Sequence, residues 1–172
     1  MSIIQAAQFA ARSHLGQQRK YNGQPYIFHP ARVAGRVAIH PLATEEMVAA
    51  AFLHDVLEDC DVTYGELEGR FGRRLADMVQ SLTNPSKGSS LSRARRKQMD
   101  RDHLATVNWQ IKIIKLIDRI DNVQELQGAD SSFMLKYALE SELLADVIGD
   151  ADLELKAELL GYINNLKAEA SK

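Results

Sequence analysis

His54-Asp55-Val56-Leu57-Glu58-Asp59 directly follows the apolar run Met47 to Leu53, so four ionisable side chains stand at the end of a segment with core-helix character. In a continuous helix, His54 and Glu58 are four residues apart, as are Asp55 and Asp59, which places all four on neighbouring parts of one surface. Ionised carboxylates beside a core helix are costly unless they meet a cation or strong donors. A bound metal ion would remove that cost and supply a centre for chemistry.

Helical periodicity extends outward from this stretch through the whole chain, because apolar residues recur at three- and four-residue spacing and strand-like alternation is nearly absent. Thr44 and Thr63 stand where N-caps are expected, and the segment from Asn84 to Ser90 has the composition of a mobile loop. The predicted fold is an all-α helical bundle of about nine helices. The predicted helices span residues 2–15, 29–39, 44–58, 63–70, 72–83, 91–105, 108–127, 131–147 and 151–169.

Length and composition predict one domain spanning residues 1–172, with 45% hydrophobic and 26% charged residues. The net charge of -2 gives no global sign of a nucleic-acid or membrane partner, and no apolar stretch has the length of a membrane helix. A single cysteine, Cys60, cannot form an intrachain disulfide, which fits a cytoplasmic protein. Assembly into a homo-oligomer is compatible with the sequence.

The helix predicted over 108–127 contains a second group of polar residues within an apolar surface. Its apolar residues surround most of the circumference, which predicts a buried, central helix. Asp118 and Asn122 lie four residues apart on one face of it. One interpretation is structural, with Asp118 paired to Arg119 or a lysine; the other makes Asp118 a metal ligand together with His54 and Asp55.

Two further elements could contribute to a site, each with a simpler alternative. His29 stands in a loop before Pro30 and could complete a mixed histidine and carboxylate metal site, although a lone histidine is more often a packed or capping residue. Arg19 and Lys20 could bind phosphate, or form a solvated basic turn. A second basic cluster, Arg93 to Arg101, has no interleaved aromatic residues and is interpreted as a solvated helix face.

Taken in order, these motifs resemble the HD-domain hydrolases, and within them the RelA/SpoT-type (p)ppGpp hydrolase domain in a small stand-alone form. The resemblance covers roughly residues 5 to 127. The matching segments are His14-x-Gly16-Gln17-x-Arg19-Lys20, Gly23-x-Pro25-Tyr26-Ile27-x-His29-Pro30, Leu53-His54-Asp55-Val56-x-Glu58-Asp59 and Lys115-Leu116-x-Asp118-Arg119-x-x-Asn122.

The resemblance implies a site and a reaction. It implies one divalent metal ion, Mn²⁺, held by His29, His54, Asp55 and Asp118, with Glu58 and Asp59 as the catalytic pair that positions or deprotonates the attacking water. It implies removal of the 3′-pyrophosphate of ppGpp or pppGpp, giving GDP or GTP. The residues that match substrate-binding positions, or could reach the substrate, are Arg19, Lys20, Tyr26, Asn122, Lys97 and Tyr137.

Two alternative functions remain beside this one. The family has histidine where this chain has Asp121, and the segment after Gly128 matches poorly, so another phosphorylated nucleotide or nucleotide cofactor is an alternative substrate. The other alternative is a non-catalytic nucleotide-binding protein. Retention of both Glu58 and Asp59 argues against it, since a pure binder has no need of a water-activating pair.

Overall fold

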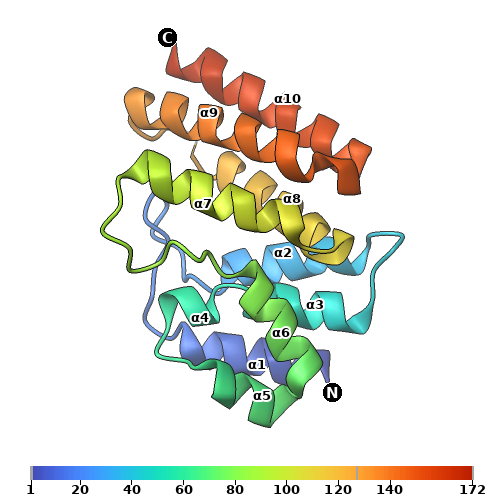
Figure 1. Cartoon of the computed structure of the whole chain (residues 1–172). Coiled ribbons are helices and arrows are strands. Elements are labelled where there is room, and N and C mark those ends of the chain that lie inside the picture. The colour runs from blue at the N-terminus through green and yellow to red at the C-terminus, as the bar shows by residue number, and fades with distance from the viewer. Residues whose placement is uncertain (1, 127, 172) are drawn as a thin grey trace. The chain divides into compact units, whose positions relative to one another are not determined.

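The computed structural model describes residues 2–126 and 128–171, and within it the chain forms two compact units, Met1–Lys87 and Gly88–Lys172 (Figure 1). The described residues form ten α-helices and one 3-10 helix, and their only β-type pairing is an isolated bridge between Gln18 and Pro25. The predicted all-α fold is therefore confirmed. None of the described helices combines the length and the apolar character needed to cross a membrane.

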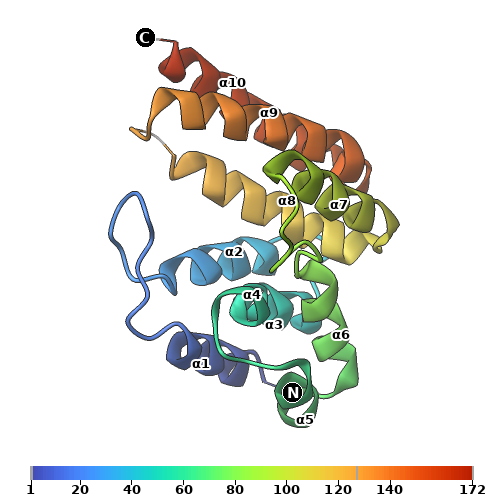
Figure 2. The same ribbon diagram turned by 60° about the vertical axis from the view of Figure 1, so that its left-hand side comes forward.

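The first unit is built around one central helix. Its helices are α1 (Ile3–Ser13), α2 (Phe28–Ala38), α3 (Glu45–Leu53), α4 (Val56–Asp59), α5 (Tyr64–Phe71) and α6 (Arg73–Leu82). Helix α3 packs against α1, α2 and α6, and its residues from Met47 to Ala51 are all buried (Figure 2). As predicted, the Thr44 and Thr63 side chains cap α3 and α5 by accepting hydrogen bonds from the N–H groups of Met47 and Glu66.

The second unit also has a buried central helix. Its helices are α7 (Arg93–Thr106), α8 (Trp109–Gln124), α9 (Ser131–Ile148), the 3-10 helix η1 (Gly149–Ala151) and α10 (Leu153–Ala170). Helices α9 and α10 run side by side in opposite directions, and α8 packs against both (Figures 1 and 2). The isoleucines of α8 are all buried, which confirms the prediction of a central helix. Position 127, its predicted last residue, lies outside the described residues.

One predicted helix is wrong in a way that bears on the site. The helix predicted over 44–58 ends at Leu53, and α4 begins at Val56, with His54 and Asp55 forming a turn between them. The N–H groups of Glu58 and Asp59 both donate to the carbonyl oxygen of Asp55, at 3.0 and 2.8 Å. His54 and Asp55 therefore lie in a turn between two helices, and not in one continuous helix with Glu58 and Asp59.

Candidate metal centre and adjoining residues

Three side chains of the first unit converge on one point. The Nε2 atoms of His29 and His54 lie 3.2 Å apart, and the Asp55 Oδ2 atom lies 3.6 Å from the first and 3.1 Å from the second. One ligand atom from each of the three lies within 4.8 Å of the others. His29 comes from the start of α2, whereas His54 and Asp55 come from the turn after α3. The arrangement brings together three of the four predicted metal ligands.

The hydrogen bonding of His54 prepares it to bind a metal. Its Nδ1 atom lies 2.7 Å from the carbonyl oxygen of Ala51, and because a carbonyl can only accept, Nδ1 carries the proton. If the ring is neutral, Nε2 carries the lone pair; this atom lies 3.2 Å from His29 Nε2, and both residues are about 1% exposed. A second ring nitrogen bonded to a backbone carbonyl is the usual outer contact of a metal-bound histidine. These donors fit a divalent first-row metal ion.

Tyr26 joins the metal cluster to the predicted catalytic pair. Its hydroxyl oxygen lies 2.8 Å from Asp55 Oδ2 and 2.7 Å from Asp59 Oδ2. Burial, reinforced by the charges of Asp55 and Asp59, raises the pKa of Tyr26 far above its ordinary range. The hydroxyl therefore stays protonated and acts as a hydrogen-bond donor. Tyr26 is one of the predicted substrate-binding residues, and in the structure its hydroxyl contacts two carboxylates.

The two members of the predicted catalytic pair are held in different ways. Asp59, which is exposed, accepts from Tyr26 through its side chain and from Gln17 Nε2 through its backbone carbonyl, at 2.7 Å. The Glu58 carboxylate instead accepts from the backbone N–H of Asn84 at 2.7 Å and from Asn84 Nδ2 at 3.0 Å. Both carboxylates therefore have fixed neutral donors on the first unit.

The basic segment before His29 forms an ordered loop. Arg19 N–H donates to the Gln24 carbonyl and Tyr26 N–H to that of Gln17, so the loop folds back on itself. Gly16 and Gly23 turn the chain with φ values of 82° and 67°, a region that favours glycine. The Arg19 guanidinium lies 5.2 Å from the centre of the Tyr26 ring. The Lys20 ammonium lies over Tyr21 instead.

The fourth predicted ligand, Asp118, belongs to the second unit, on the buried helix α8. Its Oδ2 atom lies 3.0 Å from Lys115 Nζ, and its Oδ1 atom accepts from Asn122 Nδ2 at 2.6 Å. Lys115 and Asp118 are each about 5% exposed. The pairing with a lysine is the structural interpretation raised from the sequence, and it leaves open a further role for this carboxylate when a metal binds.

A cationic cluster on the second unit includes two of the predicted substrate contacts, Lys97 and Tyr137. The Arg119 guanidinium lies 4.7 Å from the centre of the Tyr137 ring. Burial, followed by the nearby charge of Arg119, lowers the pKa of Lys97. Arg119 Nε is buried without a hydrogen-bond partner among the described residues. Lys97 is also paired with Asp100 at 3.5 Å, so part of the positive charge here is offset.

Three residues that hold the site were not singled out from the sequence. Asn84 followed by a proline has the composition of a loop, and its partner Glu58 lies 26 positions away. Gln17 was noted only as part of a motif. His14 likewise appears only in that motif; in the structure it contacts Gln17, is 2% exposed and stacks on Tyr26 with ring centres 4.6 Å apart. The motif that contains His14 and Gln17 could have indicated these two residues, whereas no local signal indicates Asn84.

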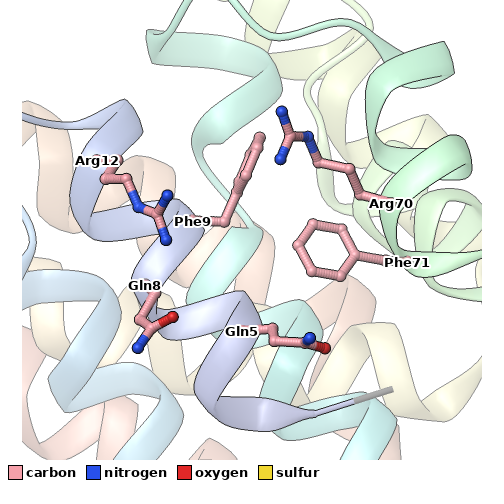
Figure 3. A pocket seen from close by; sticks show the side chains of 6 residues that line it. All are labelled: Gln5, Gln8, Phe9, Arg12, Arg70 and Phe71. Carbon is pink, nitrogen blue, oxygen red and sulfur yellow. The ribbon is translucent and has the colours of Figure 1, made fainter.

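A pocket of about 300 Å³ lies between α1 and α5, and none of the predicted site residues lines it. Figure 3 shows its lining residues, which are Gln5, Gln8, Phe9, Arg12, Arg70 and Phe71. Its two arginines are offset by Asp61 and Glu66, which line an adjoining hollow with them. Arg70 is already paired with Glu66 at 3.1 Å. The balance of charge gives this pocket no clear ligand preference.

Comparison with known proteins points to one family. The sequence profile of the HD domain family matches residues 6–145. The guanosine-3′,5′-bis(diphosphate) 3′-pyrophosphohydrolase MESH1 of Danio rerio is 37% identical over 127 residues, which cover 72% of this chain and 68% of that relative. The guanosine-3′,5′-bis(diphosphate) 3′-pyrophosphohydrolase of Aquifex aeolicus is 37% identical over 124 residues, which cover 72% of this chain but only 18% of that relative.

A solved structure shares the whole fold. It is described as a metazoan ortholog of SpoT that hydrolyzes ppGpp, and it aligns with a TM-score of 0.85 and 26% sequence identity over 95% of this chain and 94% of that chain. Together with the histidine and aspartate cluster and the all-α fold, these matches assign the chain. It belongs to the HD domain family, in the group that contains the guanosine-3′,5′-bis(diphosphate) 3′-pyrophosphohydrolases.

Proposed function

We propose that this protein is a metal-dependent hydrolase that removes the 3′-pyrophosphate of ppGpp or pppGpp, leaving GDP or GTP. The observation that carries the proposal is the convergence of His29, His54 and Asp55, with Tyr26 joining this cluster to Asp59, in a chain 37% identical to a relative named for this reaction. Pyrophosphate leaves intact when water attacks the phosphorus bound to the 3′-oxygen. The bond from that phosphorus to the 3′-oxygen then breaks, and the 3′-oxygen takes a proton.

The metal would be held by His29, His54, Asp55 and Asp118, and we propose Mn²⁺ as the ion. The two imidazole nitrogens and the Asp55 oxygen suit a first-row divalent ion better than a thiolate-seeking one. Such an ion, when bound, lowers the pKa of a coordinated water and withdraws charge from phosphoryl oxygens. Because Asp118 belongs to the second unit, this ligand set makes residues 1–172 one catalytic domain. The family match over 6–145 includes parts of both units and supports this.

Glu58 and Asp59 would act on the attacking water. They lie on the short helix α4, directly after the turn of His54 and Asp55, and their carboxylates are held by neutral donors from Asn84 and Tyr26. Carboxylates fixed in this way can orient a water molecule and accept its proton. Tyr26, which keeps its own proton, would keep Asp55 and Asp59 in a constant relation to each other.

The substrate's phosphates and base would be held by side chains from both units. Arg19, placed over the ring of Tyr26, whose hydroxyl contacts Asp59, would bind phosphate from the first unit, with Lys20 adding charge. Asn122 follows Asp118 by one turn of α8, and Lys97 and Tyr137 lie around Arg119. A cytoplasmic enzyme with a small nucleotide as its substrate fits the single cysteine and the small net charge.

A substrate screen tests this proposal. Purified protein with Mn²⁺ is incubated with ppGpp, pppGpp, NADPH and nucleoside monophosphates, and products are resolved by ion-exchange chromatography. We expect ppGpp and pppGpp to be converted with the highest kcat/KM. Preferred cleavage of NADPH or a monophosphate would contradict the proposed substrate, while the protein would still be a phosphohydrolase. Absence of turnover on all of them would contradict the enzymatic function.

A further inference from the structure

The Glu58 carboxylate is held by one residue from a distant loop. Asn84 donates to one carboxylate oxygen through its backbone N–H, at 2.7 Å, and to the other through its side-chain amide, at 3.0 Å. Among the residues that the structure describes, Asn84 provides all the hydrogen bonds recorded for this carboxylate. Two donors on two oxygens fix the carboxylate in both position and rotation.

The same loop also forms a hydrogen bond with the backbone of α4. Asn84 comes just after the Thr83 cap of α6, and Lys87 Nζ donates to the carbonyl oxygen of Leu57 at 2.9 Å. Helix α4 has only four residues, and a single turn is not stable without outside contacts. The segment Asn84–Lys87 therefore holds in place the short helix that carries Glu58 and Asp59.

Asn84 is neutral, which suits a carboxylate that is to accept a proton from water. Among the described residues, no lysine, arginine or histidine pairs with Glu58, so its position is fixed by neutral donors. A neutral amide orients a carboxylate without cancelling its charge, as a cation would. Asn84 is 26 positions from Glu58 in the sequence, so its two donors reach the carboxylate only when the chain is folded.

We propose that Asn84 is a positioning residue for catalysis, which acts by holding the Glu58 carboxylate toward the attacking water. The inference rests on the proposed function for the role of Glu58, and on the two hydrogen bonds for the role of Asn84. It makes the segment Asn84–Lys87, in a loop that has the composition of a mobile connection, a supporting part of the active site.

Kinetics with ppGpp measure the effect. Asn84→Ala keeps the backbone donor and removes the amide donor, so kcat should fall about tenfold while KM and Mn²⁺ content stay the same. Asn84→Asp keeps the shape but places a second negative charge beside Glu58, so its kcat should fall further. Ser89→Ala, in the same loop, removes a hydroxyl that accepts only from the Leu91 N–H and should leave kcat unchanged.

A double-mutant cycle separates positioning from general loosening of the fold. If Asn84 acts through Glu58, Asn84→Ala should add no further loss of kcat in a Glu58→Gln protein, measured with radiolabelled ppGpp. An equal tenfold loss in both backgrounds would overturn the proposal. An unchanged kcat in the two single variants Asn84→Ala and Asn84→Asp would also overturn the proposal. If the wild-type protein does not cleave ppGpp, the proposed function fails instead.

The contact itself has a readout that needs no substrate. In the ¹H–¹⁵N NMR spectrum, the backbone N–H of Asn84 and its side-chain amide should be shifted downfield by the carboxylate. Both should move upfield in Glu58→Ala, while the Leu91 N–H, bonded to Ser89, should not. If the Asn84 resonances do not move, Asn84 does not hold Glu58, whatever the substrate of the enzyme.

Discussion

Burial near the metal cluster keeps Cys60 in its neutral form. Burial, reinforced by the charge of Asp59, raises the pKa of the Cys60 thiol from the ordinary 9.0 to about 11. At pH 8 the folded protein should hold roughly a hundredfold less thiolate than the unfolded chain, so alkylation by iodoacetamide should be slowed by a similar factor. Thiolate absorbance that rises near pH 9 or below in the folded protein would contradict this.

The same shift gives a direction for stability. Because the unfolded chain loses the thiol proton near pH 9 and the folded chain near pH 11, the folded state binds more protons in this window. The free energy of unfolding should therefore decrease as pH rises from about 9 to about 11. Cys60→Ser should remove that part of the decrease, measured by urea denaturation of both proteins across the window.

Arg19 and Lys20 are neighbours in sequence but have different surroundings. Arg19 lies over Tyr26, which contacts Asp55 and Asp59, whereas Lys20 lies over Tyr21. Loss of a charge-assisted phosphate contact should reduce kcat/KM on ppGpp roughly ten- to hundredfold in Arg19→Ala, and less in Lys20→Ala. Arg73→Ala, an exposed arginine on α6, is the matched control and should have no effect. Equal kinetics in all three variants would place the phosphate site elsewhere.

Glu58 and Asp59 should matter for turnover and not for metal binding. Neither belongs to the cluster of His29, His54 and Asp55. Glu58→Gln and Asp59→Asn should keep the metal and lose at least about a hundredfold in kcat if each supports acid–base catalysis. Elemental analysis beside the kinetics checks this. Loss of metal from either variant would make that residue a ligand.

Helix α8 contains a buried ion pair, Lys115 with Asp118, that should depend on the metal. In metal-free protein, Lys115→Met would leave the Asp118 carboxylate buried without its cation, which should lower the free energy of unfolding by about 3 kcal/mol. Mn²⁺ should restore much of the loss if Asp118 is a ligand. Lys112→Met on the same helix removes a pair with the exposed Asp150 and should cost under about 1 kcal/mol. Urea denaturation in EDTA or in Mn²⁺ measures the free energy of unfolding of both variants. An equal loss in Lys115→Met and Lys112→Met would contradict the prediction that Asp118 depends on Lys115 in metal-free protein.

Most helices were predictable because each has its own apolar spacing and its own cap. Thr44, Thr63 and the isoleucines of α8 illustrate this. The break between α3 and α4 was not predictable, because the apolar pattern from Met47 continues through Leu57. It occurs where the Asp55 side chain meets Tyr26 and the two histidines, which are contacts made only in the folded chain.

The candidate site shows the same division between local and distant information. The histidines and carboxylates were found from their residue types and order, and the structure gathers His29, His54 and Asp55. The donors that orient them were missed, because Asn84 and Gln17 reach Glu58 and Asp59 across 26 and 42 positions. Gln17 lies within a recognised motif, but no local pattern indicates which residue Gln17 or Asn84 contacts.

At the scale of the whole molecule, the proposed enzyme needs residues from both compact units. Under the proposal, the first unit would supply three ligands and the carboxylate pair, and the second would supply Asp118 and the cluster around Arg119. Neither unit alone would then contain the full proposed ligand set or all of the proposed phosphate contacts. The chain should therefore act as one catalytic domain.

Metal content and ppGpp turnover, measured on the same samples, test this account most directly. Wild-type protein, Asp55→Ala and Asp118→Ala are stripped of metal, reloaded with Mn²⁺ and dialysed, then assayed by elemental analysis and by release of GDP and pyrophosphate. We predict one Mn²⁺ per chain and equal amounts of the two products for the wild type, with both metal and turnover lost in each variant while helical content is kept. Fully active metal-free protein, or an Asp118→Ala variant that keeps both metal and turnover, would contradict the account.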